Sequence, residues 1–78
     1  MELTFDPRYN IAYIRLKDPL EGVETIRLSE SVNIDLAPDG TLYGIELLNA
    51  NEQLGQLNSR KMKLVNEASG AELNFDLP

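Results

Sequence analysis

The sequence predicts one small α+β domain: an antiparallel β-meander of about five strands with one short helix packed on one face, followed by a C-terminal β-hairpin or strand. The first observation is that apolar and polar residues alternate over most of the first fifty positions, as they do in half-buried strands. The second is that turn residues interrupt this alternation at short intervals. The third is a change to helical spacing after position 48. The 78 residues allow a single domain, in which we distinguish a meander with its helix (1–57) from a C-terminal hairpin or tail (58–78).

Five strands are expected before the helix, each bounded by turn residues. Leu3 and Phe5 alternate with polar residues, and Pro7 begins the turn that follows them. Ala12 and Ile14 continue the same period of two, and the third run is the weakest of the five. The expected strands cover residues 2–6, 12–17, 23–28, 32–36 and 41–48.

The turn between the last two of these strands has the most specific sequence. In the run Ala37-Pro38-Asp39-Gly40, proline presets the first central turn position, aspartate suits the second, and glycine accepts the positive φ after it. We therefore expect a type I turn followed by a glycine bulge, with Ala37 opposite Thr41. Counting outward from that pair places Leu36 opposite Leu42, Asp35 opposite Tyr43, Ile34 opposite Gly44, Asn33 opposite Ile45 and Val32 opposite Glu46.

A glycine in the middle of the last strand, Gly44, indicates that another element approaches the backbone closely. We expect that element to be a helix that begins near Asn49. Asn49 can cap the helix together with Glu52, three positions later. The apolar stripe of the helix comprises Ala50, Leu54 and Leu57.

The chain after residue 57 has two interpretations. In the first, the helix stops near Ser59 and a hairpin follows, with a turn at 66–70 between one strand carrying Met62 and Leu64 and another carrying Leu73, Phe75 and Leu77. In the second, the helix continues through Leu64 and Ala68 to a cap at Gly70. We favour the hairpin, because Gly55, Asn58 and Ser59 are poor residues for a helix interior.

The expected register gives the sheet two partly apolar faces. One face carries Val32, Ile34, Leu36, Leu42 and Leu48 and would hold the helix. The opposite face would mix apolar and polar groups, as contact surfaces do. Either the C-terminal segment covers this second face or a second molecule does, and the sequence favours neither. The possible partner surface comprises Tyr13, Asn33, Asp35, Tyr43, Ile45 and Leu47.

Composition excludes several classes of function. The chain contains no cysteine and no histidine, which removes disulfides, thiol nucleophiles, Cys/His zinc sites and imidazole catalysis. Thirteen acidic and seven basic residues give a net charge of −6, which disfavours nucleic acid as a partner. No secretory signal is recognisable, and no stretch approaches the roughly 18 apolar residues of a membrane span. We therefore expect a cytoplasmic protein that contacts neither membranes nor nucleic acid.

One polar cluster could carry chemistry. In the expected register Asp35 and Tyr43 lie opposite each other, with Glu46 nearby, so a carboxylate base and a phenol donor could form a small ligand-binding or catalytic site. A cross-strand hydrogen bond that fixes register explains the same pair more simply. We expect no catalytic, cofactor-binding or metal-binding residues, because no second element of a catalytic constellation is visible.

Two motifs resemble a known family. Phe5-Asp6-Pro7 with the run 12–16 resembles the opening of the YuzE-like small bacterial proteins, a domain of unknown function. The run from Val32 through Gly40 to Ala50 resembles the central signature of that family more strongly, and the resemblance covers about two-thirds of the chain. Asn10 departs from the pattern, since an acidic residue is usual there. The resemblance implies no established activity, but it suggests an antitoxin-type role beside a small toxin-like protein.

The sequence thus favours a non-enzymatic protein-interaction module without a cofactor. Its partner would be a second copy in a homodimer, or a small basic protein attracted by the net charge of −6. The alternative is the small-ligand-binding or catalytic domain built on Asp35, Tyr43 and Glu46.

Overall fold

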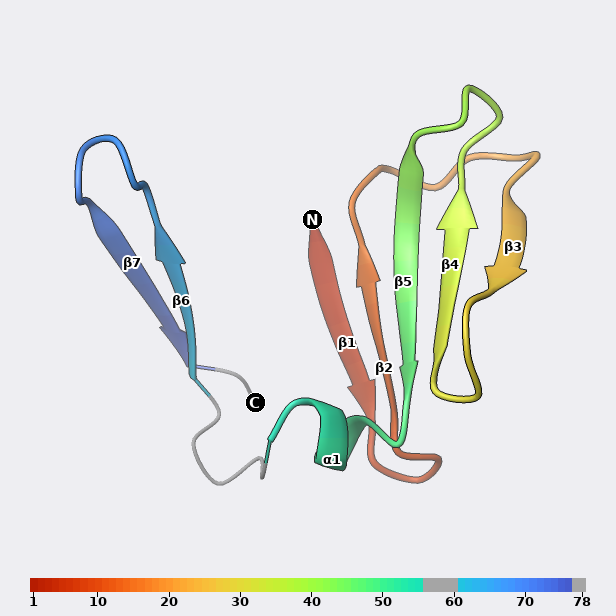
Figure 1. The fold of residues 1–78 in the computed structure, drawn as a ribbon, viewed down its shortest axis with the longest axis horizontal. Helices are drawn as coiled ribbons and strands as arrows, with labels where there is room; N and C mark the ends of the chain where they lie inside the picture. The colour runs from red at the N-terminus through yellow and green to blue at the C-terminus, as the bar shows by residue number, and fades with distance from the viewer. Residues whose placement is uncertain (56–60, 77–78) are drawn as a thin grey trace.

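A computed structural model of the chain describes residues 1–55 and 61–76, and the predicted α+β fold class is confirmed (Figure 1). A five-stranded antiparallel sheet and one short helix precede a two-stranded antiparallel sheet. The elements are β1 (Glu2–Asp6), β2 (Ile11–Arg15), β3 (Glu24–Arg27), β4 (Val32–Leu36), β5 (Leu42–Leu48), α1 (Ala50–Gln53), β6 (Lys61–Val65) and β7 (Glu72–Asp76).

The strands of the large sheet lie in the order β1-β2-β5-β4-β3, and every neighbouring pair is antiparallel. The five strands do not form the continuous meander that was predicted, because β2 pairs with β5 and not with β3. Two hairpin-connected units, β1-β2 and β3-β4-β5, meet through β2 and β5. The connection between β2 and β3 passes the end of the sheet to reach its far edge (Figure 1). It packs against the 37–40 turn there, since a Cβ on Gly22 would lie 3.1 Å from Cγ of Pro38.

The turn between β4 and β5 has the predicted form. The backbone N–H of Gly40 donates to the carbonyl of Ala37 at 2.8 Å, and that of Ala37 donates to the carbonyl of Thr41 at 2.8 Å. Gly40 has a φ of +84°, which is the left-handed conformation expected after a type I turn. Leu36 also pairs with Leu42 as predicted.

Beyond that pair the predicted register is wrong by one residue. A bulge makes Tyr43 the extra residue of β5, so that Asp35 pairs with Gly44, Ile34 with Ile45, Asn33 with Glu46 and Val32 with Leu47. A shift of one residue moves each later side chain of β5 to the other face relative to β4. The reason is burial of apolar surface. With the bulge, one continuous row across the sheet contains Leu3, Ile14, Ile45, Ile34 and Ile26.

The corrected register replaces two mixed faces with one apolar and one polar face. Residues paired across antiparallel strands share a face, and residues alternate along each strand. The predicted partner surface is therefore split: Tyr13, Asn33 and Asp35 lie on the polar face, and Ile45 and Leu47 lie on the opposite one. The apolar face carries Leu3, Phe5, Ala12, Ile14, Ile26, Val32, Ile34, Ile45 and Leu47. The opposite face is polar except for the pair Ile11 and Leu48 at one end, and its polar residues are Glu2, Thr4, Asp6, Tyr13, Arg15, Thr25, Arg27, Asn33, Asp35 and Glu46.

The helix is shorter than predicted and is capped by a different residue. Asn49 has a φ of +53° and makes no side-chain cap hydrogen bond. Asn10 supplies the cap instead: its Oδ1 accepts from the N–H of Asn51 at 2.8 Å, and its carbonyl accepts from the N–H of Ala50 at 2.9 Å. The α-helix ends at Gln53, before the left-handed Gly55. The predicted stripe residue Leu57, and Asn58 and Ser59 with it, lie outside the described residues.

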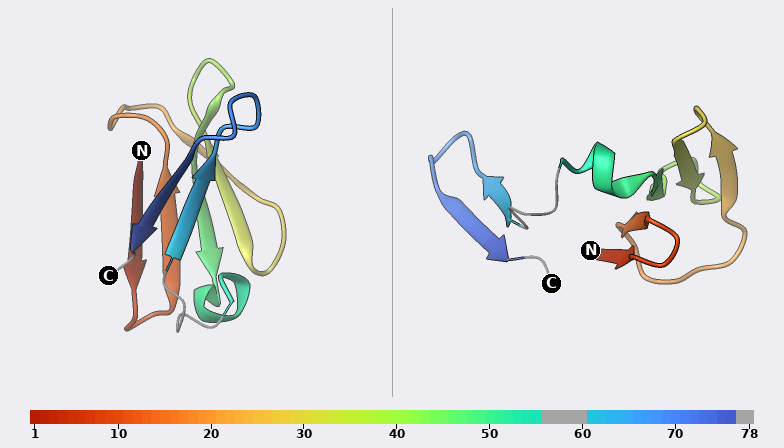
Figure 2. Two further views of the ribbon diagram at one scale, coloured as in Figure 1. Left: turned by 90° about the vertical axis from the view of Figure 1, so that its left-hand side faces the viewer. Right: turned by 90° about the horizontal axis from the view of Figure 1, so that it is seen from below.

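The C-terminal hairpin confirms the first interpretation of residues after 60 and contradicts the continuous helix. Met62 pairs with Phe75 and Leu64 with Leu73. Asn66 forms the turn, since its Oδ1 accepts from the N–H of Ala68 at 3.0 Å and its carbonyl from that of Gly70 at 2.8 Å. The predicted strand residue Leu77 lies outside the described part. Figure 2 shows β6 and β7 on the side of the large sheet from which α1 also projects.

The described residues contain very little fully buried core. Within 1–55 and 61–76 the buried apolar residues are three alanines, Ala12, Ala37 and Ala50, and no large side chain is fully buried. In the same ranges no helix has the length and apolar character needed to cross a membrane. The large aliphatic side chains of the described residues thus lie on the surface of the sheet and are only partly buried.

Candidate functional site

The polar face of the sheet is organised around the carboxylate of Asp35. The hydroxyl of Tyr13 donates to Asp35 Oδ2 at 2.5 Å, and the hydroxyl of Thr25 donates to Asp35 Oδ1 at 2.6 Å. Both carboxylate oxygens therefore accept hydrogen bonds from side chains of other strands, Tyr13 of β2 and Thr25 of β3. The predicted pair of Asp35 with Tyr43 is wrong, because Tyr43 is the bulged residue; Asp35 pairs with Gly44, and its carboxylate accepts a hydrogen bond from Tyr13 instead.

Gly44 makes the contact between Tyr13 and Asp35 possible. Asp35 pairs with Gly44, whereas Tyr13 belongs to the adjacent row, so the phenol ring must cross over the glycine. A Cβ on Gly44 would lie 2.6 Å from Cζ of Tyr13 and 3.0 Å from the backbone oxygen of Ile14. The prediction that Gly44 marks a close approach is confirmed, but the approaching group is the Tyr13 side chain rather than the helix.

The environment of Tyr13 determines what its hydroxyl can do. Burial, the hydrogen bond to Asp35 and the negative charge of that carboxylate all raise the pKa of Tyr13 far above its ordinary value. The phenol thus stays protonated even at alkaline pH, and its hydroxyl serves as a hydrogen-bond donor to Asp35.

The remaining polar candidates form a second cross-strand pair. Asn33 donates through Nδ2 to Oε1 of Glu46 at 2.9 Å, in the same row as Tyr13. The carboxylates of Glu46 and Asp35 thus accept hydrogen bonds from different side chains. Among residues 1–55 and 61–76, no group of three acidic side chains is arranged to hold a metal ion. These contacts join β2, β3, β4 and β5 and explain the polar face as a device that fixes the register.

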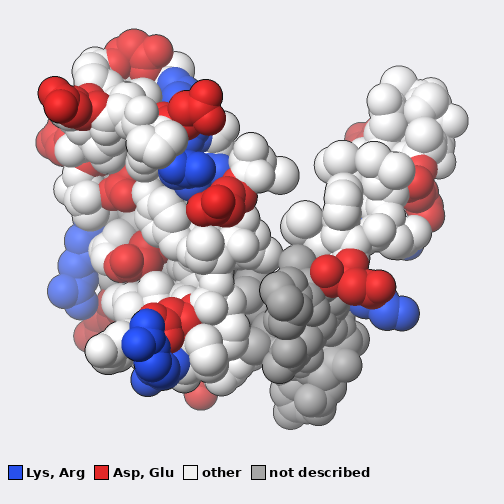
Figure 3. Space-filling model, turned by 180° about the vertical axis from the view of Figure 1, so that it is seen from behind, with Lys and Arg blue, Asp and Glu red and all other residues white. Residues whose placement is uncertain are grey.

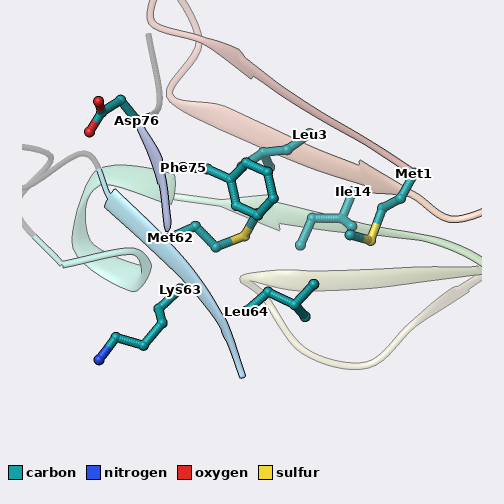
Figure 4. Close-up of a pocket in the computed structure, with 8 residues that line it drawn as sticks. All are labelled: Met1, Leu3, Ile14, Met62, Lys63, Leu64, Phe75 and Asp76. Carbon is teal, nitrogen blue, oxygen red and sulfur yellow. The ribbon is translucent and has the colours of Figure 1, made fainter. Parts of the chain in front are cut away.

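The apolar face borders a pocket of about 480 Å³. Met1, Leu3 and Ile14 line it from the large sheet, and Met62, Leu64 and Phe75 line it from the hairpin. Figure 4 shows these six apolar side chains directed into the space between the two sheets, while the side chains of Lys63 and Asp76 point away from it. The pocket therefore separates two apolar surfaces that face each other.

The apolar surfaces on both sides of the pocket are only partly covered. On the hairpin, Leu64 is 55% exposed, Leu73 59% and Phe75 43%. On the large sheet the partly covered apolar face extends to the edge strand β3, and every residue of that strand is exposed. The apolar face of the large sheet was not predicted in this form, because the expected register distributed Ile34 and Ile45 over opposite faces. The apolar residues of the hairpin strands were predicted, because apolar and polar residues alternate there.

The fold and its two faces define a class: a small antiparallel sheet with one face tied by polar side chains and the other apolar and incompletely covered. The model of a protein family of unknown function, DUF2283, matches residues 2–51, and the chain belongs to this family. Neither a curated protein nor a solved structure matches the sequence. The matched residues run from β1 to the start of α1, so the family domain is the five-stranded sheet and the hairpin lies outside the match.

Proposed function

We propose that this chain is a non-enzymatic protein-interaction module that binds a protein partner through the apolar face of its five-stranded sheet. One observation carries the proposal: the large aliphatic residues of this face are not enclosed, and the buried apolar residues among those described are alanines. Most of these side chains are half-buried, and Ile26 at the edge of the sheet is exposed. Incompletely covered apolar side chains gathered on one face are typical of an interaction site. The alternative site on Asp35, Tyr43 and Glu46 has no comparable support, since Tyr43 is displaced by the bulge and both oxygens of Asp35 are bonded to side chains.

The charge of the domain favours a basic partner. The net charge of −6 would steer a positively charged protein toward the sheet. Seen from behind, acidic side chains are distributed over several parts of the large sheet and basic ones are fewer (Figure 3). This pattern, together with the resemblance to YuzE-like bacterial proteins, supports the more specific proposal of a cytoplasmic, antitoxin-like protein. A neighbouring gene for a small basic protein would support it, and the absence of such a gene would count against it.

A pair of single-cysteine variants tests whether the apolar face is the binding surface. The chain has no cysteine, so Ile26→Cys and Arg27→Cys each provide one site for an environment-sensitive fluorophore. Both positions are on the edge strand β3, but Ile26 lies on the apolar face and Arg27 on the polar face. We expect the emission of the label at position 26 to shift to shorter wavelength when the protein is concentrated or a basic partner is added, while the label at 27 stays unchanged.

The matched control makes the result specific to one face. Equal shifts at positions 26 and 27 would indicate nonspecific aggregation, and the proposal would fail. It would also fail if the label at position 26 stayed solvated at every concentration and with every partner tested.

A further inference from the structure

The two amphipathic parts of the chain are complementary in their apolar faces. On the hairpin, Met62, Leu64, Leu73 and Phe75 share one face, while the other face carries Lys61, Lys63, Glu72, Asn74 and Asp76 together with Val65. A two-stranded hairpin is marginally stable by itself in water and needs a surface to pack on. The apolar face of the five-stranded sheet is the surface available within this chain.

Within one molecule this contact is incomplete. The pocket of about 480 Å³ lies between the hairpin and the part of the sheet formed by β1 and β2. Ile26, the apolar residue of β3, is not among those lining it. The residues of the sheet that face the hairpin across the pocket are thus on its β1 side, and Ile26 at the β3 edge is exposed.

We propose that a second copy of the chain completes the contact: the hairpin of each molecule packs on the apolar sheet face of the other, which forms a twofold-symmetric dimer with exchanged hairpins. The proposal rests on the proposed function, because it takes the apolar sheet face as the interface and names its occupant. A reciprocal arrangement uses the same pair of surfaces twice and closes without leaving a free hairpin.

The exposed area of the chain agrees with this arrangement. The accessible surface is 6007 Å², whereas a compact monomer of 8.8 kDa is expected to expose about 4,800 Å². The excess of roughly 1,200 Å² exceeds the ~800 Å² that each partner contributes to an interface of standard size. The radius of gyration leads to the same conclusion: it is 14.1 Å, against about 11.5 Å expected for a compact domain of this length.

Charge favours the exchanged hairpin over a dimer in which two large sheets stack face to face. Residues 1–55 contain ten acidic and four basic residues, whereas residues 56–78 contain three of each. Two stacked sheets would bring two strongly negative units together. A neutral hairpin can lie on a negative sheet without that repulsion.

Cross-linking between two different single-cysteine variants tests the exchange in the full chain. Leu3 and Met62 both line the pocket, one from the sheet and one from the hairpin. We would mix Leu3→Cys and Met62→Cys in equal amounts and treat the mixture with a short bismaleimide. A covalent heterodimer is expected, since in this mixture a cross-link can form only between molecules. Thr4→Cys, which is next to Leu3 but on the polar face, is the control and should give little product with Met62→Cys.

Sedimentation of the unlabelled protein complements the cross-link. Wild type should sediment as a dimer, and Phe75→Asp should weaken dimerisation about tenfold or more, since a large apolar anchor is replaced by a charge. Asn74→Asp introduces the same charge on the opposite face of the hairpin and should leave the dimer unchanged.

The outcomes separate this inference from the proposed function. A double variant with both Leu3→Cys and Met62→Cys that cross-links only within single chains, in a monomeric protein, would overturn the exchange. A dimer without the cross-link between molecules would also overturn it. In either case a blue shift of the label at position 26 on adding a basic protein would leave the proposed function standing. Absence of that shift as well would overturn both.

Discussion

A single tyrosine and a single glycine determine how the polar face of the sheet is assembled. Tyr13 crosses the backbone at Gly44 to reach Asp35 in the next row of the sheet. The contact joins β2 to β4, two strands that are not neighbours, across the intervening β5. Because the hydroxyl is held as a donor and the carboxylate accepts two hydrogen bonds, the contact favours one register over its alternatives.

Replacement of Gly44 by alanine tests this explanation. The added methyl group would overlap the Tyr13 ring, so we expect Gly44→Ala to lower the free energy of unfolding by about 1–3 kcal/mol, the usual cost of overpacking. Chemical denaturation measures the change. The same substitution in a Tyr13→Ala background should cost clearly less, because the two nearest atoms to the added methyl group belong to the Tyr13 ring and hydroxyl. Equal costs in both backgrounds would show that the ring is not the obstacle.

At the scale of elements, the short helix depends on a residue from a distant turn. Asn10 caps α1 across 41 residues of sequence, whereas Asn49, directly before the helix, makes no side-chain cap hydrogen bond. Both asparagines have a left-handed backbone, with φ of +56° and +53°. A helix of four residues cannot be stable by itself, so this contact with the β1–β2 turn positions it on the sheet.

The two asparagines form a matched pair for a test of the cap. Glycine accepts the left-handed conformation, so substitution by glycine removes the side chain without adding backbone strain. We expect Asn10→Gly to reduce the free energy of unfolding by about 0.5–1.5 kcal/mol through the lost hydrogen bond to Asn51. Asn49→Gly should change it by a few tenths at most. Thermal and urea unfolding of both variants provide the measurement, and a larger loss at Asn49 would contradict the assignment.

For the whole molecule, the shortage of buried apolar surface is the dominant physical fact. A chain of this size buries roughly 60% of its unfolded surface even when compact, which leaves little stability to lose. Here the fully buried apolar residues among those described are alanines, and the aliphatic row from Leu3 to Ile26 is only partly covered. Association would bury that surface and add to the stability of the fold.

Thermal stability should therefore depend on protein concentration. If folding is coupled to dimerisation, Tm rises with concentration by mass action, and we expect a measurable increase over about a hundredfold range. Circular dichroism melts at several concentrations would record it. Phe75→Asp should weaken the dependence, while Asn74→Asp should retain it. A Tm that is independent of concentration in the wild type would indicate a self-sufficient monomer.

Local signals in the sequence determined the strands, the 37–40 turn and the C-terminal hairpin. Alternation, proline, aspartate and glycine each favour a backbone conformation over a few residues, so the turns and strands that they predict are local structures. The composition likewise determined the absence of thiol and imidazole chemistry, because the chain contains neither group.

Tertiary structure alone decided the neighbours of β2 and β5, the bulge at Tyr43, the crossing of Tyr13 over Gly44 and the cap from Asn10. All of these except the bulge join residues far apart in the chain. Their positions depend on how the aliphatic row from Leu3 to Ile26 aligns across five strands. That alignment favours one extra residue in β5, since the gain from burying apolar side chains on one face exceeds the cost of a local break in the ladder.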